Sequence, residues 1–152
     1  MKTLVLGLGN PILSDDSVGF RVAQALMGRF DEKKVSVMES DLAGFSLLDL
    51  LLGYDKVIII DSIQTEGGKV GQIYRLSPQD FATTRHAASP HDVNLITALE
   101  LGKRLNLEMP KKITIFAIEV EDVTTFSEKC TPKVERVIPQ VVQMVAEEVE
   151  NL

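Results

Sequence analysis

Hydrophobic and polar positions along this chain form two alternating kinds of segment. Short continuous apolar runs are separated by longer stretches in which apolar residues recur every three or four positions. The first kind is typical of strands covered on both faces, and the second is typical of amphipathic helices. Their alternation predicts an α/β fold with a mostly parallel sheet. The strands are expected at residues 3–6, 35–39, 56–60, 70–76 and 113–118.

The helices are expected in the stretches between these strands. Ser14 can cap the first helix and place Asp15 and Asp16 in its first turn, where acids stabilise the helix dipole. The sequence Ser-Pro-His-Asp at 89–92 supplies a cap, a first-position proline and an early acid for a later helix. That later helix is predicted at 90–105. The other helices are predicted at 45–52 and from Thr131-Pro132 along a stripe of valine and isoleucine.

Connection lengths determine the expected order of the strands. Between Asp61 and the strand at 70–76 lie too few residues for a helical crossover, and Gly67-Gly68 supplies a turn. That strand is therefore predicted to be an antiparallel edge, and residues 77–88 to be a loop with at most one helical turn. With right-handed crossovers elsewhere, we expect a three-layer α/β domain with five strands in the order 2-1-3-5-4 and helices on both faces.

Composition narrows the class of protein. The 152 residues suffice for one domain, expected over 1–152, that buries roughly 70% of the surface of the unfolded chain. The net charge of −6 disfavours nucleic-acid binding through clustered Lys and Arg. No apolar run approaches the ~20 residues of a membrane span, and the N-terminal run is interrupted at Gly7, too early for a signal peptide. Cys130 is the only cysteine, so an internal disulfide and a thiolate metal cage are excluded. We expect a cytoplasmic protein with neither nucleic acid nor membrane as partner.

The glycine-rich turn after the first strand resembles the start of a dinucleotide fingerprint. Gly7 and Gly9 fit that pattern, but Ile12 occupies the position of its third glycine. Asp15 and Asp16 would also repel a pyrophosphate at the start of the following helix. A cation suits this corner better, and a nucleotide-binding regulatory module remains an alternative function.

Three polar residues are expected to meet where the parallel strands end. Asp16 follows the first strand, Asp61 ends the central one, and His91 enters a helix whose preceding loop can return to the same edge. Two carboxylates and an imidazole form a mixed oxygen and nitrogen site suited to a divalent transition metal. Each residue also has a simpler interpretation: Asp15 and Asp16 as first-turn acids, Asp61 as a turn cap, and His91, like His86, as an ordinary surface histidine.

Four motifs, in the right order along the chain, resemble those of the hydrogenase maturation protease family. They are Leu-Gly-Leu-Gly-Asn-Pro-Ile-Leu-Ser-Asp-Asp-Ser-Val-Gly at 6–19, Leu-Ala-Gly-Phe-Ser-Leu-Leu within 39–48, Ile-Ile-Asp-Ser-Ile at 59–63 and Ser-Pro-His-Asp at 89–92. The resemblance continues through Leu-Glu-Met-Pro-Lys-Lys-Ile-Thr at 107–114 and Cys-Thr-Pro at 130–132, and so covers nearly the whole chain.

This resemblance implies an activity and a role for each candidate residue. Members of the family are endopeptidases that remove a C-terminal extension from the large-subunit precursor of nickel-iron hydrogenases after nickel insertion. By resemblance, Asp16, Asp61 and His91 are expected to be the metal-contacting and catalytic residues, with nickel supplied by the substrate and Zn²⁺ or Cd²⁺ as mimics. Asp16 stands where the family often has the longer glutamate, and Ser17 where a glycine commonly follows.

The sequence Leu-Gly-Leu-Gly-Asn-Pro is also similar to a motif of peptidyl-tRNA hydrolases. In those esterases an arginine and a histidine follow the Asn-Pro closely, whereas here Arg85 and His86 come some seventy residues later. The acidic balance of the chain also disfavours tRNA as a substrate. A peptidyl-tRNA hydrolase-like esterase is therefore the weaker alternative.

Overall fold

The computed structural model describes residues 1–41, 45–83 and 90–151, and for Phe45 and residues 90–94 it describes the backbone alone. The elements are, in chain order, β1 (Thr3–Leu8), the 3₁₀ turn η1 (Ser14–Ser17), α1 (Val18–Leu26), β2 (Val35–Ser40), α2 (Phe45–Leu51), β3 (Lys56–Ile63), β4 (Ile73–Leu76), α3 (Pro78–Thr83), α4 (Pro90–Arg104), β5 (Lys112–Glu119) and α5 (Pro132–Glu150). Each predicted strand and helix is present, and α3 is a short helix within the segment expected to be a loop.

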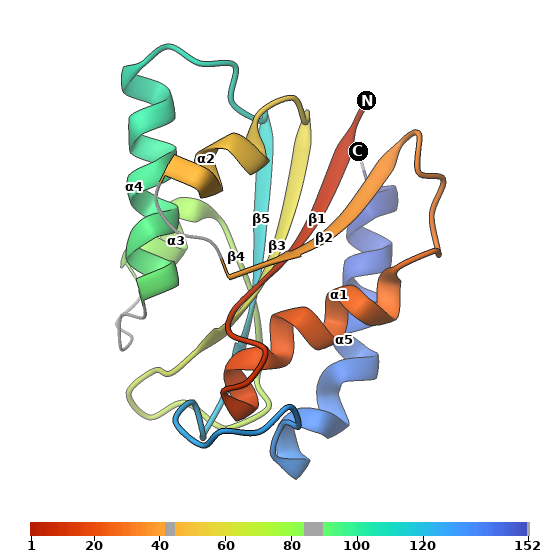
Figure 1. Ribbon diagram of the computed structural model, residues 1–152, viewed down its shortest axis with the longest axis vertical. Coiled ribbons are helices and arrows are strands. Elements are labelled where there is room, and N and C mark those ends of the chain that lie inside the picture. Colours follow the sequence, from red (N-terminus) through yellow and green to blue (C-terminus); the bar gives the residue numbers. More distant parts are fainter. Residues whose placement is uncertain (42–44, 84–89, 152) are drawn as a thin grey trace.

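The strands form one mixed sheet in the order β2-β1-β3-β5-β4, as connection lengths predicted. β1 pairs in parallel with β2 and β3, and β3 pairs in parallel with β5. β4 pairs antiparallel with β5 and forms the predicted edge. Helices α1 and α5 lie on one side of the sheet, and α2, α3 and α4 lie on the other, so the predicted three-layer fold is confirmed (Figure 1).

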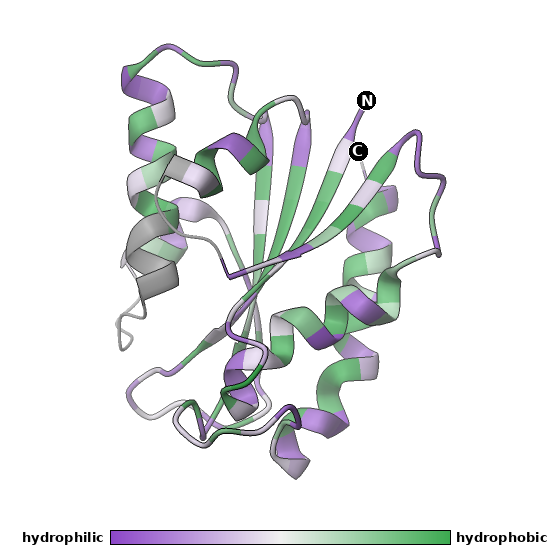
Figure 2. Cartoon of the chain, in the orientation of Figure 1, coloured by the Kyte–Doolittle hydropathy of each residue, from purple (hydrophilic) through white to green (hydrophobic). Residues whose placement is uncertain are grey.

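Successive side chains of the central strands pack into two separate cores. Val5 and Ile58 belong to the core shared with α1 and α5, whereas their neighbours Leu6 and Ile59 belong to the core shared with α2 and α4. Because side chains alternate between the faces of a sheet, a strand covered on both faces needs a continuous apolar run. Figure 2 shows these runs as green strands between helices that carry hydrophilic residues as well.

A pair of glycines allows β1 and α1 to pack backbone against backbone. A Cβ atom added to Gly7 would lie 2.2 Å from the carbonyl oxygen of Gly19, and one added to Gly19 would lie 2.3 Å from that of Leu8. Neither distance is sterically possible for a real side chain. Gly7 is thus required for close packing of the strand on the helix.

The start of the first helix differs from its prediction. Ser14 does not cap α1: it lies in η1 with a φ of 45°, and its hydroxyl donates to the carbonyl oxygen of Lys129 at 3.3 Å. Helix α1 begins only at Val18, and Ser17 at its N-cap makes no side-chain capping bond. Asp15 and Asp16 therefore lie in a tight turn ahead of the helix, and this turn directs their side chains.

A lysine is buried at the start of β3, although the side chain is charged. The Lys56 amine donates to the carbonyl oxygens of Glu148 and, at 2.5 Å, of Asn151, at the C-terminal end of α5. Burial lowers the pKa of this amine, while the nearby Glu148 carboxylate opposes that shift. The amine satisfies carbonyl groups that a helix end leaves without intrahelical partners.

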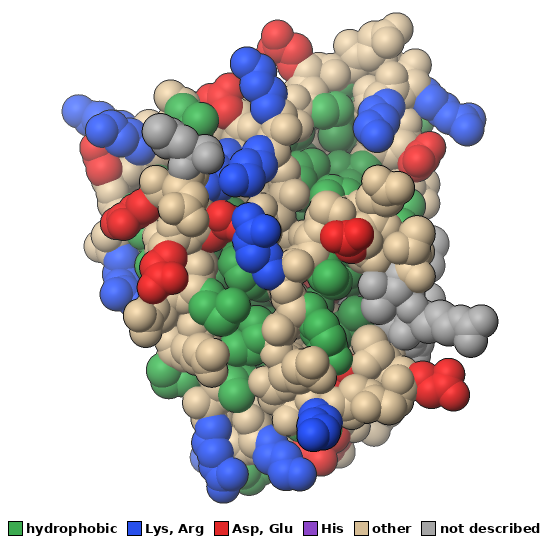
Figure 3. All heavy atoms as spheres, turned by 180° about the vertical axis from the view of Figure 1, so that it is seen from behind, with side chains coloured by type: hydrophobic (Ala, Val, Ile, Leu, Met, Phe, Trp, Pro, Cys, Tyr) green, Lys and Arg blue, Asp and Glu red, His purple; other side chains and the backbone are tan. Residues whose placement is uncertain are grey.

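The outer surface carries charges of both signs. On the face shown in Figure 3, acidic and basic side chains are interspersed, with hydrophobic side chains between them. In the part of the chain that the structure describes, no helix is both long and apolar enough to cross a membrane.

Candidate active site

Two buried carboxylates lie next to one serine at the carboxyl edge, the edge formed by the carboxyl ends of β1, β3 and β5. Asp16 is 7% exposed, and its Oδ1 accepts a hydrogen bond from the Ser62 hydroxyl at 2.7 Å. Asp61 is 1% exposed, and its Oδ1 accepts from the Ser62 backbone N–H at 2.8 Å. Asp16 and Asp61 are thus each hydrogen-bonded to Ser62, Asp16 to its hydroxyl group and Asp61 to its backbone N–H, although the sequence had not suggested this serine.

The extension of β3 explains this arrangement. The strand was predicted to end at Ile60, but it continues to Ile63, so Asp61 and Ser62 lie inside it. Because side chains alternate along a strand, Asp61 is on the face of Ile59 and Ile63, which is covered by α2 and α4. Ser62 is on the opposite face, where η1 carries Asp16. Its position directly after Asp61 at the end of an apolar run was the only sequence signal for this serine.

A glycine in the preceding loop positions Asp16. Gly9 has a φ of 147°, and a Cβ atom there would lie 2.0 Å from the backbone carbonyl oxygen of Asp16. The same carbonyl accepts from the Asn10 N–H at 3.2 Å, and the Asp16 N–H donates to Leu13 at 3.0 Å. Only glycine allows this approach, so Gly9 positions a carboxylate rather than binding a phosphate.

The neighbouring carboxylate, Asp15, has a different set of partners. Its side chain is fully buried and accepts from the backbone N–H groups of Glu121 and Asp122, each at 3.1 Å. It also accepts from the N–H of Thr131 at 2.6 Å and from the Thr131 hydroxyl at 2.9 Å. Asp15 thus joins both ends of the loop between β5 and α5, which makes it a structural residue.

His91 lies in the first turn of α4, and this turn is at the same end of the molecule as the carboxyl edge (Figure 1). Its side chain lies outside the described residues, and His86 lies outside them altogether. Among the described side chains, no group of three His, Cys, Asp or Glu residues is arranged to hold a metal ion. The described part of the candidate site therefore consists of two carboxylates, which are oxygen donors suited to a divalent cation.

Cys130 lies close to this region but is unsuited to nucleophilic catalysis. Its Sγ is buried and lies 3.5 Å from the Ser17 hydroxyl. Burial raises the pKa of the thiol, so little of the reactive thiolate is present at neutral pH. Hydrolysis at the carboxyl edge would instead rely on carboxylates, which can act as general bases or metal ligands.

Another buried acid lies at the same end of the sheet. Glu119, at the end of β5, accepts from the Thr65 N–H at 2.8 Å and the Tyr74 hydroxyl at 3.0 Å. A Cβ atom on Gly68 would lie 1.9 Å from a carboxylate oxygen of Glu119. Glu119 therefore fixes the connection between β3 and β4 tightly against the sheet.

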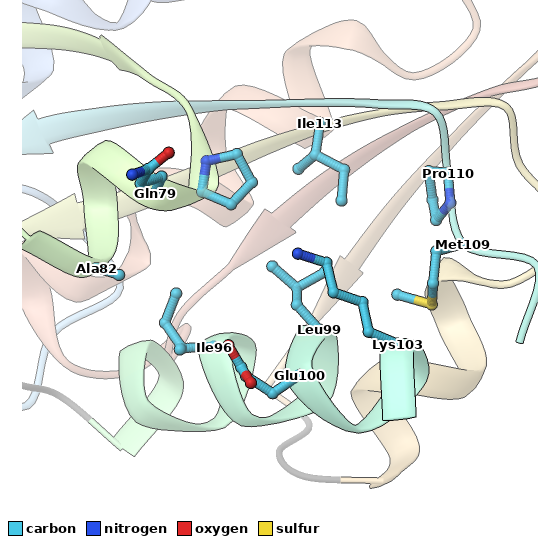
Figure 4. Close-up of a pocket in the computed structure, with 10 residues that line it drawn as sticks. Gln79, Ala82, Ile96, Leu99, Glu100, Lys103, Met109, Pro110 and Ile113 are labelled. Atoms are coloured by element: carbon cyan, nitrogen blue, oxygen red, sulfur yellow. The ribbon is translucent and has the colours of Figure 1, made fainter. Parts of the chain in front are cut away.

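An apolar cavity of about 330 Å³ lies away from the carboxylates, between α3, α4 and the start of β5. Figure 4 shows Ile96, Leu99 and Lys103 of α4 turned toward Ile113 of β5. Because Ile113 follows the first residue of β5, the cavity lies toward the amino ends of the parallel strands. It is therefore separate from the candidate active site.

Comparisons with known proteins agree with this fold. A family model described as hydrogenase maturation protease matches residues 20–148. The chain is 31% identical over 147 residues to the hydrogenase 2 maturation protease of Escherichia coli (strain K12), an alignment that covers 95% of this chain and 88% of that protein. The structure of the hydrogenase maturating endopeptidase HybD from E. coli superposes with a TM-score of 0.86 at 28% identity, covering 98% of this chain and 92% of that one. HybD from Thermococcus kodakarensis superposes with a TM-score of 0.72 at 22% identity, covering 99% and 100%, and shows the shared fold.

Proposed function

Because this chain belongs to the hydrogenase maturation protease family and is a peptidase, we propose that it removes the C-terminal extension of a nickel-loaded [NiFe] hydrogenase large-subunit precursor. In this proposal Asp16, Asp61 and His91 contact the nickel that the precursor carries. The observation that carries it is that Asp16 and Asp61 are both buried at the carboxyl edge, where each bonds to Ser62. Ligands in open α/β sheets bind at this edge.

The donor set suits recognition of a substrate-borne metal. Carboxylate oxygens and an imidazole nitrogen are ligands that nickel and zinc accept, and three protein ligands leave coordination positions for the substrate's own groups. A precursor that carries nickel would therefore bind more favourably than one that lacks it, and cleavage would depend on nickel insertion.

The same residues can support peptide hydrolysis. A water molecule adds through its oxygen to the carbonyl carbon of the scissile bond, and the carbon–nitrogen bond then breaks. One carboxylate, Asp16 or Asp61, would take the proton of that water, and the leaving amine nitrogen would receive it. The metal of the substrate would hold the peptide bond near these carboxylates and polarise its carbonyl group.

The test is a cleavage assay with purified components. Nickel-loaded and nickel-free precursors of a hydrogenase from the same organism are each incubated with the protein, and the released tail is followed by mass spectrometry. Asp16→Asn and Asp61→Asn keep side-chain shape, and we expect each to slow cleavage by about 100-fold or more. His91→Ala tests the third residue in the same assay.

Glu32→Gln is the matched control, because Glu32 is an exposed acid near the start of β2, at the opposite end of the sheet from the site. We expect it to cleave like the wild type. Equal cleavage of both precursors would contradict nickel recognition. No cleavage of any cognate nickel-loaded precursor by the wild type would overturn the proposed function.

A further inference from the structure

Two large apolar side chains are exposed on two loops whose backbones are hydrogen-bonded to each other. Phe126 is 82% exposed in the loop between β5 and α5, and Ile12 is 49% exposed in the loop between β1 and η1. The loops are joined by the N–H of Ser127, which donates to Ile12 at 2.9 Å, and by that of Ser14, which donates to Ser127 at 2.9 Å. We call Phe126 and Ile12 together the apolar rim.

Both loops are held firmly, so the rim presents a fixed surface. Asp15 accepts hydrogen bonds from Asp122 and Thr131, which are near the two ends of the loop that carries Phe126. A turn within that loop is also closed by Asp122, whose side chain accepts a hydrogen bond from the Thr125 N–H at 3.0 Å. An exposed aromatic side chain on a fixed loop loses little conformational entropy on binding, which is a property of interface anchors.

The rim is continuous with the candidate active site. The loop that carries Ile12 includes Asn10, whose N–H donates to the backbone carbonyl of Asp16, and it ends at Leu13, whose carbonyl oxygen accepts from the Asp16 N–H. A protein that contacts Ile12 therefore touches the loop that is hydrogen-bonded to the backbone of Asp16. The other exposed apolar side chains of the described residues, apart from the terminal Met1, lie elsewhere; Leu105, for example, follows α4 at the opposite end of the sheet.

We propose that the apolar rim is the docking surface for the precursor, and that it binds an apolar patch on that protein substrate. This inference rests on the proposed function for the identity of the partner. A peptidase that cuts one bond of a folded protein gains from an anchor outside the reacting groups, because the anchor holds the scissile segment near the carboxylates. A fixed phenylalanine beside the site fits that role.

The kinetic test separates docking from chemistry. We expect Phe126→Ala to raise KM for the precursor about tenfold while kcat stays unchanged, since uniform loss of binding affects KM alone. Ile12→Ala should raise KM by a smaller factor, and Phe126→Leu should restore most of the loss. Leu105→Ala, which removes a 56% exposed side chain at the far end of the sheet, is the control and should leave KM unchanged.

A binding measurement distinguishes failure of this inference from failure of the proposed function. With the nickel-free precursor, which the proposed function expects to stay uncleaved, the Kd is measured by biolayer interferometry for the wild type and for Phe126→Ala. A tenfold weaker Kd supports the docking surface even if no cleavage is seen. An unchanged Kd and KM, or no binding by the protein with an intact rim, would overturn it. Concentration-dependent dimers in ultracentrifugation that Phe126→Ala abolishes would instead assign the rim to self-association and would also overturn it.

Discussion

Replacing Asp15 by asparagine tests whether the two adjacent acids have separate roles. The substitution keeps the shape of a fully buried side chain but converts one of its acceptor oxygens into an NH₂ donor. The best orientation keeps an oxygen toward the N–H groups of Glu121 and Asp122 and turns the new NH₂ toward the N–H of Thr131. That N–H, now 2.6 Å from an acceptor, would face a donor instead.

The expected loss of stability follows from these contacts. A buried donor left without an acceptor costs about 1–3 kcal/mol, and hydrogen bonds to a neutral group are weaker by about 1 kcal/mol than those to a charged one. We therefore expect Asp15→Asn to lower the free energy of unfolding by about 3 kcal/mol. For a chain of this length that loss corresponds to a Tm lower by about 6–12 °C.

The assay is urea unfolding followed by circular dichroism, with Asp49→Asn on the exposed side of α2 as the matched control. The unfolding midpoint should fall for Asp15→Asn while the m-value stays constant. Folded Asp15→Asn should still cleave the precursor measurably, whereas Asp16→Asn should lose cleavage but change stability by less than about 1 kcal/mol. A stability loss for Asp15→Asn below about 0.5 kcal/mol, equal to that of the control, would refute the structural role.

Three further outcomes are expected. Isothermal titration calorimetry with Ni²⁺, Zn²⁺ or Cd²⁺ should show weaker binding to His91→Ala than to the wild type, and equal affinity would remove His91 from the metal-contacting group. Burial raises the pKa of the Cys130 thiol above its ordinary value of 9.0, so the native state holds this proton more tightly than the unfolded state. The stability that this difference contributes is lost as the pH rises through the raised pKa. Alkylation of Cys130 at pH 8 should therefore be slow in the native protein and fast in urea, and fast alkylation of the native protein would contradict the burial. Gly19→Ala would place a Cβ 2.3 Å from the Leu8 carbonyl oxygen and 2.5 Å from that of Ile60, so a loss of about 3 kcal/mol is expected in urea unfolding, and a near-neutral result would contradict the packing of α1 on the sheet.

The order of elements and the sheet topology could be predicted from the sequence, because both depend on local patterns. Apolar runs identify buried strands, helical periodicity identifies amphipathic helices, and connection lengths decide which strands can be parallel. The short link after Asp61 was enough to place β4 at an edge. The positions of Asp16 and Asp61 at one edge of the sheet follow from the same reasoning, since the carboxyl ends of β1 and β3 lie side by side.

Other features depended on contacts between distant segments, which no local pattern encodes. Asp15 and Asp16 are adjacent and chemically identical, yet one accepts from Thr131 and the other from Ser62, because η1 turns them toward different parts of the chain. A capping role for Ser14 was consistent with the sequence, but its hydroxyl bonds to Lys129 instead. The glycines that resembled a phosphate loop were likewise ambiguous until Gly9 was found against the Asp16 carbonyl. The sequence by itself determined the elements and their order. The side-chain pairings at the carboxyl edge were decided only by the tertiary structure, which brings Asp16 to Ser62, 46 positions away, and Asp15 to Thr131, 116 positions away.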